Sequence, residues 1–197
     1  MNQSHITIIV SLDRYGKMIE KMFEETLNVN AVFNSSKSLK RTLRLLTRGS
    51  VSFRFLVKNL LCQLKDYRFF WNPKNINTVK DLVAHLNRTS SQILVMYRTG
   101  IIIPKFILDH YQVINVHVTR LPKYAGLGSI LAALDAKDLN QCATAHRASL
   151  EIDSGEIIFQ IPYELDLNLS YCSNESKAYS TGIQVIARIV ESFKNLT

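Results

Sequence analysis

The sequence predicts an α/β protein with a mostly parallel sheet flanked by helices and a mixed carboxyl-terminal part. Short β-branched runs alternate with segments whose apolar residues recur at helical spacing, a rhythm typical of βα units. Near the end of the chain, two strand-like runs, "QCATAHRASLEI" and "GEIIFQIPYEL", follow one another directly, which predicts a hairpin-like pair. With 47% apolar residues, the 197-residue chain can bury a large core. We therefore expect one domain over residues 1–197.

The first half of the chain opens with a strand, a helix and a strand. The run "HITIIVSL" at residues 5–12 predicts a buried strand, and "DRYGKMIEKMFEETL" after it has the apolar spacing of a helix. "VNAVFNS" predicts the second strand, and "YRFFW" is a further strand candidate. Thr78, with Asp81 three residues later, is a capping signature that predicts a helix running to about Asn87.

The second half repeats this alternation. "SQILVMY" predicts a strand of a parallel sheet, and "RTGIIIPKFILDHY" predicts a turn and a short helix that can start at Pro104. "VINVHVTRLPKYAG" predicts a strand that breaks into a loop, and "SILAALDA" predicts a helix. The hairpin-like pair follows, and a closing helix is expected from about Asn174 to Asn195.

Basic residues are concentrated between residues 37 and 68. This segment contains nine lysines and arginines and one acidic residue, Asp66. The rest of the chain, whose total net charge is +8, is nearly neutral. The leucine spacing predicts two amphipathic helices with a break near Gly49. The positive electrostatic field of this basic segment attracts anions, which include nucleic acids, acidic membranes and phosphorylated small molecules. A plain solvated helix face is the alternative interpretation.

Cysteine usage and the terminal sequence predict a cytoplasmic protein. Cys62, Cys142 and Cys172 form no C-x-x-C pair and have no histidine at metal-ligand spacing, so we expect reduced thiols and no metal. The amino terminus lacks the basic-then-apolar order of a secretory signal. No apolar run approaches the roughly 18 residues that a membrane span needs.

Polar side chains gather at the end of one predicted strand. Asn115 and His117 are two residues apart, so both point to one face, and ligands of parallel sheets lie beyond such strand ends. Asp153 follows in a loop containing Gly155. The three groups suit acyl transfer to an amine. Asn115 and a protonated His117 could donate to the oxyanion, while Asp153 could hold the imidazole protonated and accept the amine proton. A turn cap, a buried histidine and an Asx turn are the structural alternatives.

The residues around this trio resemble a known family. "INVHVTRLPKYAGLGSILAAL" is similar to the signature of formyltransferases that use 10-formyltetrahydrofolate, in which Asn-x-His precedes a Leu-Pro-x-Tyr-x-Gly loop and a helix. "ATAHRASLEIDSGEIIFQ" resembles the family's Thr-x-His strand and Asp-x-Gly-x-Ile-Ile loop. The resemblance covers about residues 92–164. It implies a Rossmann-like formyltransferase fold with the catalytic roles on Asn115, His117 and Asp153.

The resemblance also implies where the co-substrate, 10-formyltetrahydrofolate, is held. It divides the chain into an acceptor-side half, residues 1–91, and a folate-binding and catalytic half, residues 92–197. In the family, backbone segments form both walls of the folate cleft. The corresponding residues here are Met96, Tyr97, Gly100 and Ile101 on one wall and Ala148, Leu150 and Glu151 on the other.

The loop after the catalytic strand borders the amine acceptor in this family. The resemblance therefore assigns substrate-binding roles to Thr119, Tyr124 and Gly126. Two positions depart from the family pattern, since Val118 stands where proline is frequent and Ala125 where arginine is frequent. These departures affect contacts with the acceptor and leave the catalytic functions in place.

Three family branches differ in the amine that they formylate. Methionyl-tRNA formyltransferases carry an extra carboxyl-terminal domain, whereas this chain ends one helix after the catalytic part. Glycinamide ribonucleotide formyltransferases bind a phosphate at a Gly-Asn/Ser-rich loop, where this chain has Asp13 in "SLDRYGKMIE". We therefore expect a small, phosphorylated amine, foremost a nucleotide-linked amino sugar, with the ribotide as the alternative.

The expected partners follow from the same comparison of branches. We expect neither a membrane nor a nucleic acid as partner, and a homodimer by analogy with the sugar branch. A function of another class stays open, namely a non-catalytic relative that binds anions or RNA through residues 37–68. The intact trio argues against it, because a binding module would not need these three groups.

Overall fold

Six apolar runs pair as one sheet in the computed structural model, which describes residues 5–35, 53–65 and 75–194. The strands are β1 (His5–Ser11), β2 (Val29–Asn34), β3 (Ser91–Tyr97), β4 (Gln112–His117), β5 (Asn140–Arg147) and β6 (Ile157–Glu164). Their order is β2-β1-β3-β4-β5-β6. The first four strands in this order are parallel, and β5 and β6 pair antiparallel. The α/β class with a mixed carboxyl-terminal part is confirmed.

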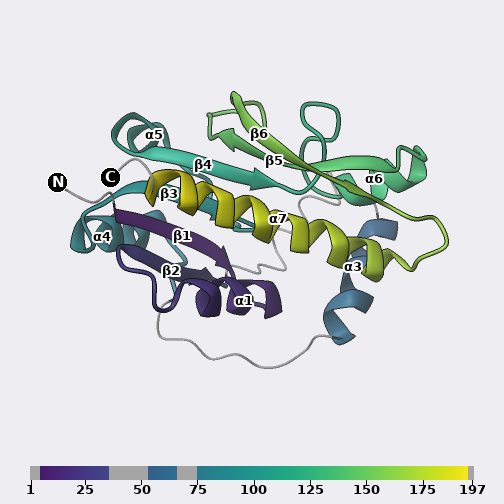
Figure 1. Ribbon diagram of the computed structural model, residues 1–197, viewed down its shortest axis with the longest axis horizontal. Helices are drawn as coiled ribbons and strands as arrows, with labels where there is room; N and C mark the ends of the chain where they lie inside the picture. The colour runs from purple at the N-terminus through teal and green to yellow at the C-terminus, as the bar shows by residue number, and fades with distance from the viewer. Residues whose placement is uncertain (1–4, 36–52, 66–74, 195–197) are drawn as a thin grey trace.

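Helices cover both faces of the sheet (Figure 1). The helices that the structure describes are α1 (Arg14–Phe23), α3 (Phe53–Lys65), α4 (Val79–Arg88), α5 (Lys105–His110), α6 (Ser129–Asp135) and α7 (Tyr171–Lys194). Buried residues of α1 and α7, such as Ile19 and Ile186, pack on one face. Leu86 of α4 and Ile107 of α5 pack on the other. Because strand side chains alternate, the parallel strands β1, β2, β3 and β4 contribute to both cores, whereas apolar residues of β5 and β6 pack in the first.

Local capping explains where the helices begin. Asp13 accepts hydrogen bonds from the amides of Tyr15 and Gly16 at the start of α1. Thr78 and Asp81 form the expected capping box at the start of α4. These caps satisfy amides that have no partner inside the helix.

The structure changes some sequence-based boundaries. β5 ends at Arg147 rather than continuing through "ASLEI", because residues 148–156 leave the sheet. The second amphipathic helix of the basic segment is α3, whereas the first and the "YRFFW" strand candidate lie outside the described residues. Among the helices that the structure describes, none has the length and apolar character to cross a membrane.

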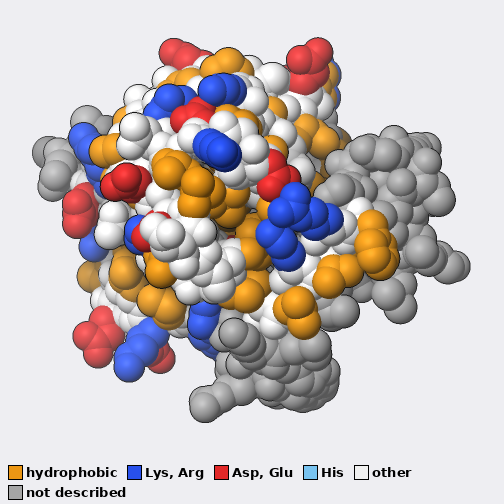
Figure 2. All heavy atoms as spheres, turned by 90° about the vertical axis from the view of Figure 1, so that its right-hand side faces the viewer, with side chains coloured by type: hydrophobic (Ala, Val, Ile, Leu, Met, Phe, Trp, Pro, Cys, Tyr) orange, Lys and Arg blue, Asp and Glu red, His pale blue; other side chains and the backbone are white. Residues whose placement is uncertain are grey.

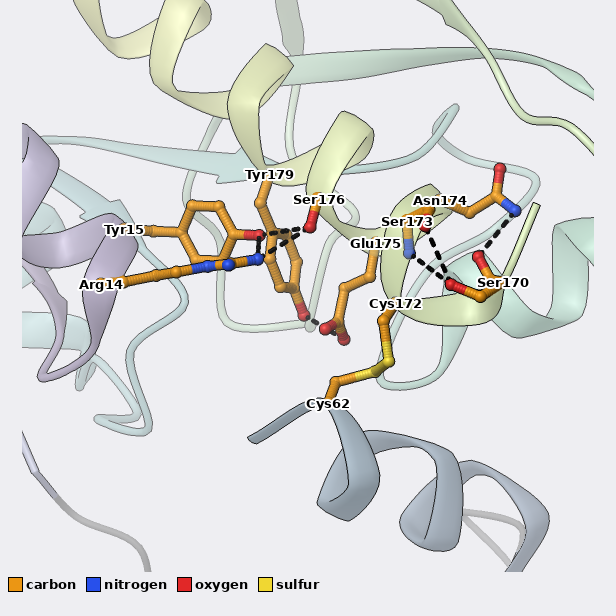
Figure 3. Close-up of a disulfide and its surroundings, with 10 residues drawn as sticks. All are labelled: Arg14, Tyr15, Cys62, Ser170, Cys172, Ser173, Asn174, Glu175, Ser176 and Tyr179. Carbon is orange, nitrogen blue, oxygen red and sulfur yellow. Dashed lines mark hydrogen bonds between the residues drawn. A yellow bond between two sulfur atoms is a disulfide. The ribbon is translucent and has the colours of Figure 1, made fainter. Parts of the chain in front are cut away.

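A disulfide joins α3 to the first turn of α7 (Figure 3). The sulfur atoms of Cys62 and Cys172 are 2.17 Å apart, and the two residues are 110 positions apart in sequence. The expectation of reduced cysteines is therefore wrong for this pair, while Cys142 is a buried free thiol. Sequence spacing hides the pair because only the packing of α3 beneath α7 brings the two residues together.

Candidate active site

Strand β4 places Asn115 and His117 on one face near its carboxyl end. Asn115 is paired with Met96 of β3 on one side and with His146 of β5 on the other, and His117 is paired with Thr144 of β5. Val113, two residues before Asn115, packs into the core on the α4 and α5 face. The polar side chains of β4 therefore point toward the same face as α4 and α5.

The loop of residues 148–156 brings Asp153 onto this face. Asp153 has a φ of 55°, in the left-handed region that Asp tolerates better than most residues. Its Oδ1 accepts a hydrogen bond from Asn115 Nδ2 at 3.0 Å, and its Oδ2 accepts one from the Gly126 amide at 2.8 Å. The tight loop needs Gly155, because a Cβ there would lie 1.8 Å from the Arg147 carbonyl oxygen. Backbone geometry thus directs the carboxylate toward β4.

The imidazole of His117 is held from both sides. Its Nδ1 lies 3.2 Å from Asp153 Oδ2. Its Nε2 lies 2.7 Å from the Tyr124 carbonyl oxygen and 2.8 Å from Thr119 Oγ1. Only 9% of the His117 side chain is exposed, which leaves little room for water to substitute for these partners.

The pKa values of this pair shift in the same direction for different reasons. Burial lowers the pKa of His117, and although the charge of Asp153 and the Tyr124 carbonyl raise it, the net direction is downward. Burial raises the pKa of Asp153, but His146, His117 and the Gly126 amide outweigh burial and lower it. At neutral pH the site therefore holds an ionised Asp153 beside a largely neutral His117.

His146 is part of the site, although the sequence assigns it no role. Its Nδ1 lies 2.9 Å from the Arg147 carbonyl oxygen, an acceptor, so Nδ1 carries the proton. Nε2 lies 3.0 Å from Asn115 Nδ2, from which it accepts when it carries no proton, and 3.6 Å from Asp153 Oδ1. Both amide hydrogens of Asn115 are thereby directed at His146 and Asp153. The available sequence signal was the position of His146 two residues after Thr144.

The expected folate-binding residues divide between two places. Met96 and Ile101 are buried in one apolar cluster, and Ala148 packs against that cluster. The Tyr97 side chain faces the opposite core, where its hydroxyl donates to the Tyr179 carbonyl oxygen. Any contact of Tyr97 with a ligand on the Asn115 face must therefore come from its backbone.

The remaining expected folate contacts lie on the loops beside the site. The Gly100 amide donates to Asn34 Oδ1 at 2.9 Å, which ties the loop after β3 to the end of β2. Leu150 is 66% exposed, and Glu151 is exposed beside it. The Glu151 carbonyl oxygen accepts from the Ser149 and Ser154 hydroxyls, which folds the loop toward Asp153.

The three expected substrate-binding residues support the trio from inside the protein. Thr119 is fully buried and contacts His117. Tyr124 is 8% exposed, and its hydroxyl donates to Asp138 Oδ2 at 3.1 Å. The Gly126 amide donates its hydrogen bond to Asp153 Oδ2. Within the described ranges, no cluster of three or more His, Cys, Asp or Glu side chains could hold a metal ion.

The fold and the site define the class of the protein. A mostly parallel sheet carries a polar trio near the end of a strand, where open α/β sheets bind ligands. The family model described as "Formyl transferase" matches residues 6–189, so the chain belongs to the formyl transferase family. The resemblance found in the sequence is confirmed.

Similar proteins come from several branches of this family. A methionyl-tRNA formyltransferase of Fusobacterium nucleatum subsp. nucleatum is 25% identical over 126 residues, which are 63% of this chain and 40% of that protein. A phosphoribosylglycinamide formyltransferase structure from Streptococcus pneumoniae has a TM-score of 0.64 and 16% identity, covering 96% of this chain and 98% of that one. A sugar N-formyltransferase structure from Shewanella sp. has a TM-score of 0.61 and 16% identity, covering 96% and 69%. At such identities the structural likenesses show the shared fold.

Proposed function

We propose that this protein transfers a formyl group from 10-formyltetrahydrofolate to a primary amine. The observation that carries the proposal is that one carboxylate, that of Asp153, contacts both Asn115 and His117. The three groups come from a strand and from a loop 36 residues or more further along the sequence. Membership of the formyl transferase family supports the same reaction class.

The three side chains divide the work of formyl transfer. The amine nitrogen would attack the formyl carbon of 10-formyltetrahydrofolate, the bond from that carbon to the folate nitrogen would break, and tetrahydrofolate would leave with a proton on that nitrogen. The amide hydrogens of Asn115 face His146 and Asp153, and Nδ1 of His117 faces Asp153. Asn115 and a protonated His117 would therefore each redirect one of these hydrogens to negative charge that develops on oxygen. Asp153, ionised because its pKa is lowered, would stabilise the imidazolium and accept the proton that leaves the amine. His117 starts largely neutral, so its protonation belongs to the reaction rather than to the resting site.

The residues beside the trio suit a flat aromatic co-substrate. Met96 and Ile101 are buried in the apolar cluster on the Asn115 face, and the two flanking loops expose the apolar side chains of Ile102, Leu150 and Ile152. Apolar surface with a few polar groups is typical of cofactor sites. We propose that these two loops hold the folate, in agreement with the assignment of residues 92–197 to folate binding and catalysis.

The start of α1 bears on the choice of acceptor. The amides that could bind a phosphate there already donate to Asp13 Oδ1, at 3.0 Å from Tyr15 and 3.2 Å from Gly16. Arg98 lies 2.8 Å from Asp13 Oδ2 and balances the charge. This arrangement disfavours a ribotide phosphate at the helix start. We therefore propose a nucleotide-linked amino sugar as the acceptor, with glycinamide ribonucleotide as the alternative.

Further expectations remain proposals of the same kind. They are the acceptor-side role of residues 1–91, a homodimer and a cytoplasmic location. The bond between Cys62 and Cys172 removes the support that cysteine usage gave to the cytoplasmic location, because disulfides persist mainly in oxidising compartments. A binding function without chemistry would leave the close packing of Asn115, His117 and Asp153 unexplained.

The catalytic proposal is tested by removing the imidazole. We expect His117→Asn to lower turnover with 10-formyltetrahydrofolate and a competent amine by about 100-fold or more, as for loss of an acid–base or oxyanion group. His110→Asn, which alters an exposed histidine of α5, is the matched control. Circular dichroism checks that both variants fold. Unchanged turnover in the folded His117 variant would refute the assignment.

The acceptor is tested by ligand-induced stabilisation. The chain is titrated with amino-sugar nucleotides, glycinamide ribonucleotide or a short RNA, each with a folate analogue that cannot release its formyl group. A rise in melting temperature for an amino-sugar nucleotide supports the proposed acceptor. A rise for the ribotide alone supports the alternative, and salt-sensitive RNA binding without folate binding supports the non-catalytic class.

A further inference from the structure

Three atoms form a closed triangle behind the imidazole of His117. Nε2 of His117 lies 2.7 Å from the Tyr124 carbonyl oxygen. Thr119 Oγ1 lies 2.8 Å from that nitrogen and 3.0 Å from the same carbonyl oxygen. Thr119 is fully buried, so its hydroxyl must find its partners within this triangle.

Counting hydrogens shows where each hydrogen of the triangle lies when the ring is neutral. Asp153 is ionised and lies 3.2 Å from Nδ1, so the neutral ring keeps its proton on Nδ1. Nε2 then presents a lone pair to the Tyr124 carbonyl oxygen, which is also an acceptor. Among the described neighbours of Nε2, the Thr119 hydroxyl is the group with a hydrogen to give.

The count changes when the ring takes up a proton. Nε2 now carries hydrogen and donates to the Tyr124 carbonyl oxygen, which has a second lone pair free. The Thr119 hydroxyl can rotate and donate to that second lone pair over 3.0 Å. In the charged ring every polar atom of the triangle is paired. In the neutral ring the Thr119 hydroxyl pairs Nε2, and the Tyr124 carbonyl oxygen receives no hydrogen within the triangle. The movement between the two states is the rotation of one hydroxyl hydrogen.

We propose that Thr119 is a positioning residue whose hydroxyl rotates between His117 Nε2 and the Tyr124 carbonyl oxygen as His117 gains and loses its proton. The rotation supplies a donor to Nε2 when the buried imidazole is neutral, so this nitrogen is paired in both protonation states and the free-energy penalty of leaving it unpaired is avoided. This gives Thr119 a role in proton transfer in place of the direct acceptor contact expected from the sequence. Its catalytic meaning rests on the proposed formyl transfer.

Other groups around His117 set the charge that the rotation must accommodate. Asp153 approaches from the loop of residues 148–156, and its charge favours the protonated ring. His146 approaches from β5 and disfavours it. The Thr119 backbone is itself fixed, because its carbonyl oxygen accepts from Thr144 Oγ1 at 3.1 Å. The hydroxyl therefore moves on a rigid support.

The first test is a titration of the full chain by NMR with 15N-labelled histidine. In the unsubstituted protein, we expect neutral His117 to show an unprotonated Nε2 and a protonated Nδ1. Thr119→Val keeps the shape and removes the hydroxyl, so the neutral ring loses its donor. We expect the pKa of His117 in this variant to rise by about half to one unit. Thr119→Ser restores the hydroxyl and should restore the titration.

Several results would overturn the inference. One is a protonated Nε2 in the neutral ring of the unsubstituted protein, a result that needs no variant to fold. Others are an unchanged titration in a folded Thr119→Val variant, or a Thr119→Ser variant that titrates like the valine variant. Since no substrate is used, these results are independent of whether formyl transfer is the reaction.

Kinetics provide the second readout when a competent amine is known. In Thr119→Val, the acid limb of the pH profile of kcat should move upward in parallel with the NMR titration, while KM for the amine stays unchanged. A change confined to KM would show that Thr119 contacts the acceptor and would overturn the positioning role. If the unsubstituted chain showed no turnover while the NMR titrations of His117 gave the expected results, the proposed function alone would be refuted.

Discussion

At the scale of single residues, the site depends on backbone positions that few side chains tolerate. Asp153 adopts a φ of 55°, and Gly155 lies where any Cβ would meet the Arg147 carbonyl oxygen. The two residues shape one tight loop, which directs the carboxylate at Asn115 and His117. Strained backbone of this kind is found at functional sites because the surrounding structure holds it in place.

Gly155→Ala should disturb both stability and the site. A Cβ at 1.8 Å from the Arg147 carbonyl oxygen forces the backbone to move, and Asp153 moves with it. We expect a loss of roughly 1–3 kcal/mol in the free energy of unfolding, measured with urea. Formyl transfer should fall as well. Glu156→Ala, at an exposed ion pair with Arg147 in the same loop, should change both quantities little. Equal stability of the two variants would contradict this account of the loop.

At the scale of elements, the described contacts of α3 join it to α6 and to the start of α7. Arg54 lies 3.1 Å from Asp135 of α6, and Lys58 lies over the ring of Tyr171. The disulfide between Cys62 and Cys172 cross-links α3 to α7 covalently (Figure 3). Figure 2 faces the side of the molecule where α3 and the start of α7 lie, and hydrophobic and basic side chains are mixed there. The outward face of α3 is partly apolar, since Phe53 is 73% exposed.

Removing the disulfide should loosen α3 more than the sheet. Cross-linking residues 110 positions apart restricts the unfolded chain, so Cys62→Ser should lower the free energy of unfolding by about 2–5 kcal/mol. Hydrogen exchange should accelerate in α3 before it does in β1 or β3. Cys142→Ala, which leaves the pair intact, is the control. Recovery of both thiols in alkylated form from the native, non-reduced protein would show that the pair does not form.

At the scale of the whole molecule, buried histidines link folding to pH. His85 of α4 is 9% exposed, and Arg88 lies 3.1 Å from its Nδ1. Its Nε2 has no hydrogen-bond partner among the described residues. Burial first, and the charge of Arg88 second, lower its pKa. His117 is lowered as well. The folded state thus binds protons on both rings less readily than the unfolded chain.

Stability should therefore fall as the solution becomes acidic. The contribution of each histidine is fully present above its unfolded pKa of about 6.5 and is lost as pH falls toward the lower folded value. We expect the free energy of unfolding of His85→Leu to depend less on pH between 7.5 and 5 than that of the unsubstituted chain, as urea titrations at several pH values would measure. An unaltered slope in His85→Leu would contradict this assignment.

Much of the fold and the trio could be predicted from the sequence because the signals are local. Strand alternation places Asn115 and His117 on one face, and the capping pair of Thr78 and Asp81 predicts the start of α4. The supporting groups could not be found in this way. That Thr119 is buried and that Tyr97 faces the opposite core depend on how distant segments pack.

By itself, the sequence determined the α/β class, the order of strands and helices, and the motif that marks the formyl transferase family, because periodicity and turn chemistry act over a few residues. The tertiary structure alone decided that His117 rests between Asp153 and Tyr124, and that Cys62 meets Cys172. Burial and contacts between distant segments set these properties. They are determined by the packed protein as a whole.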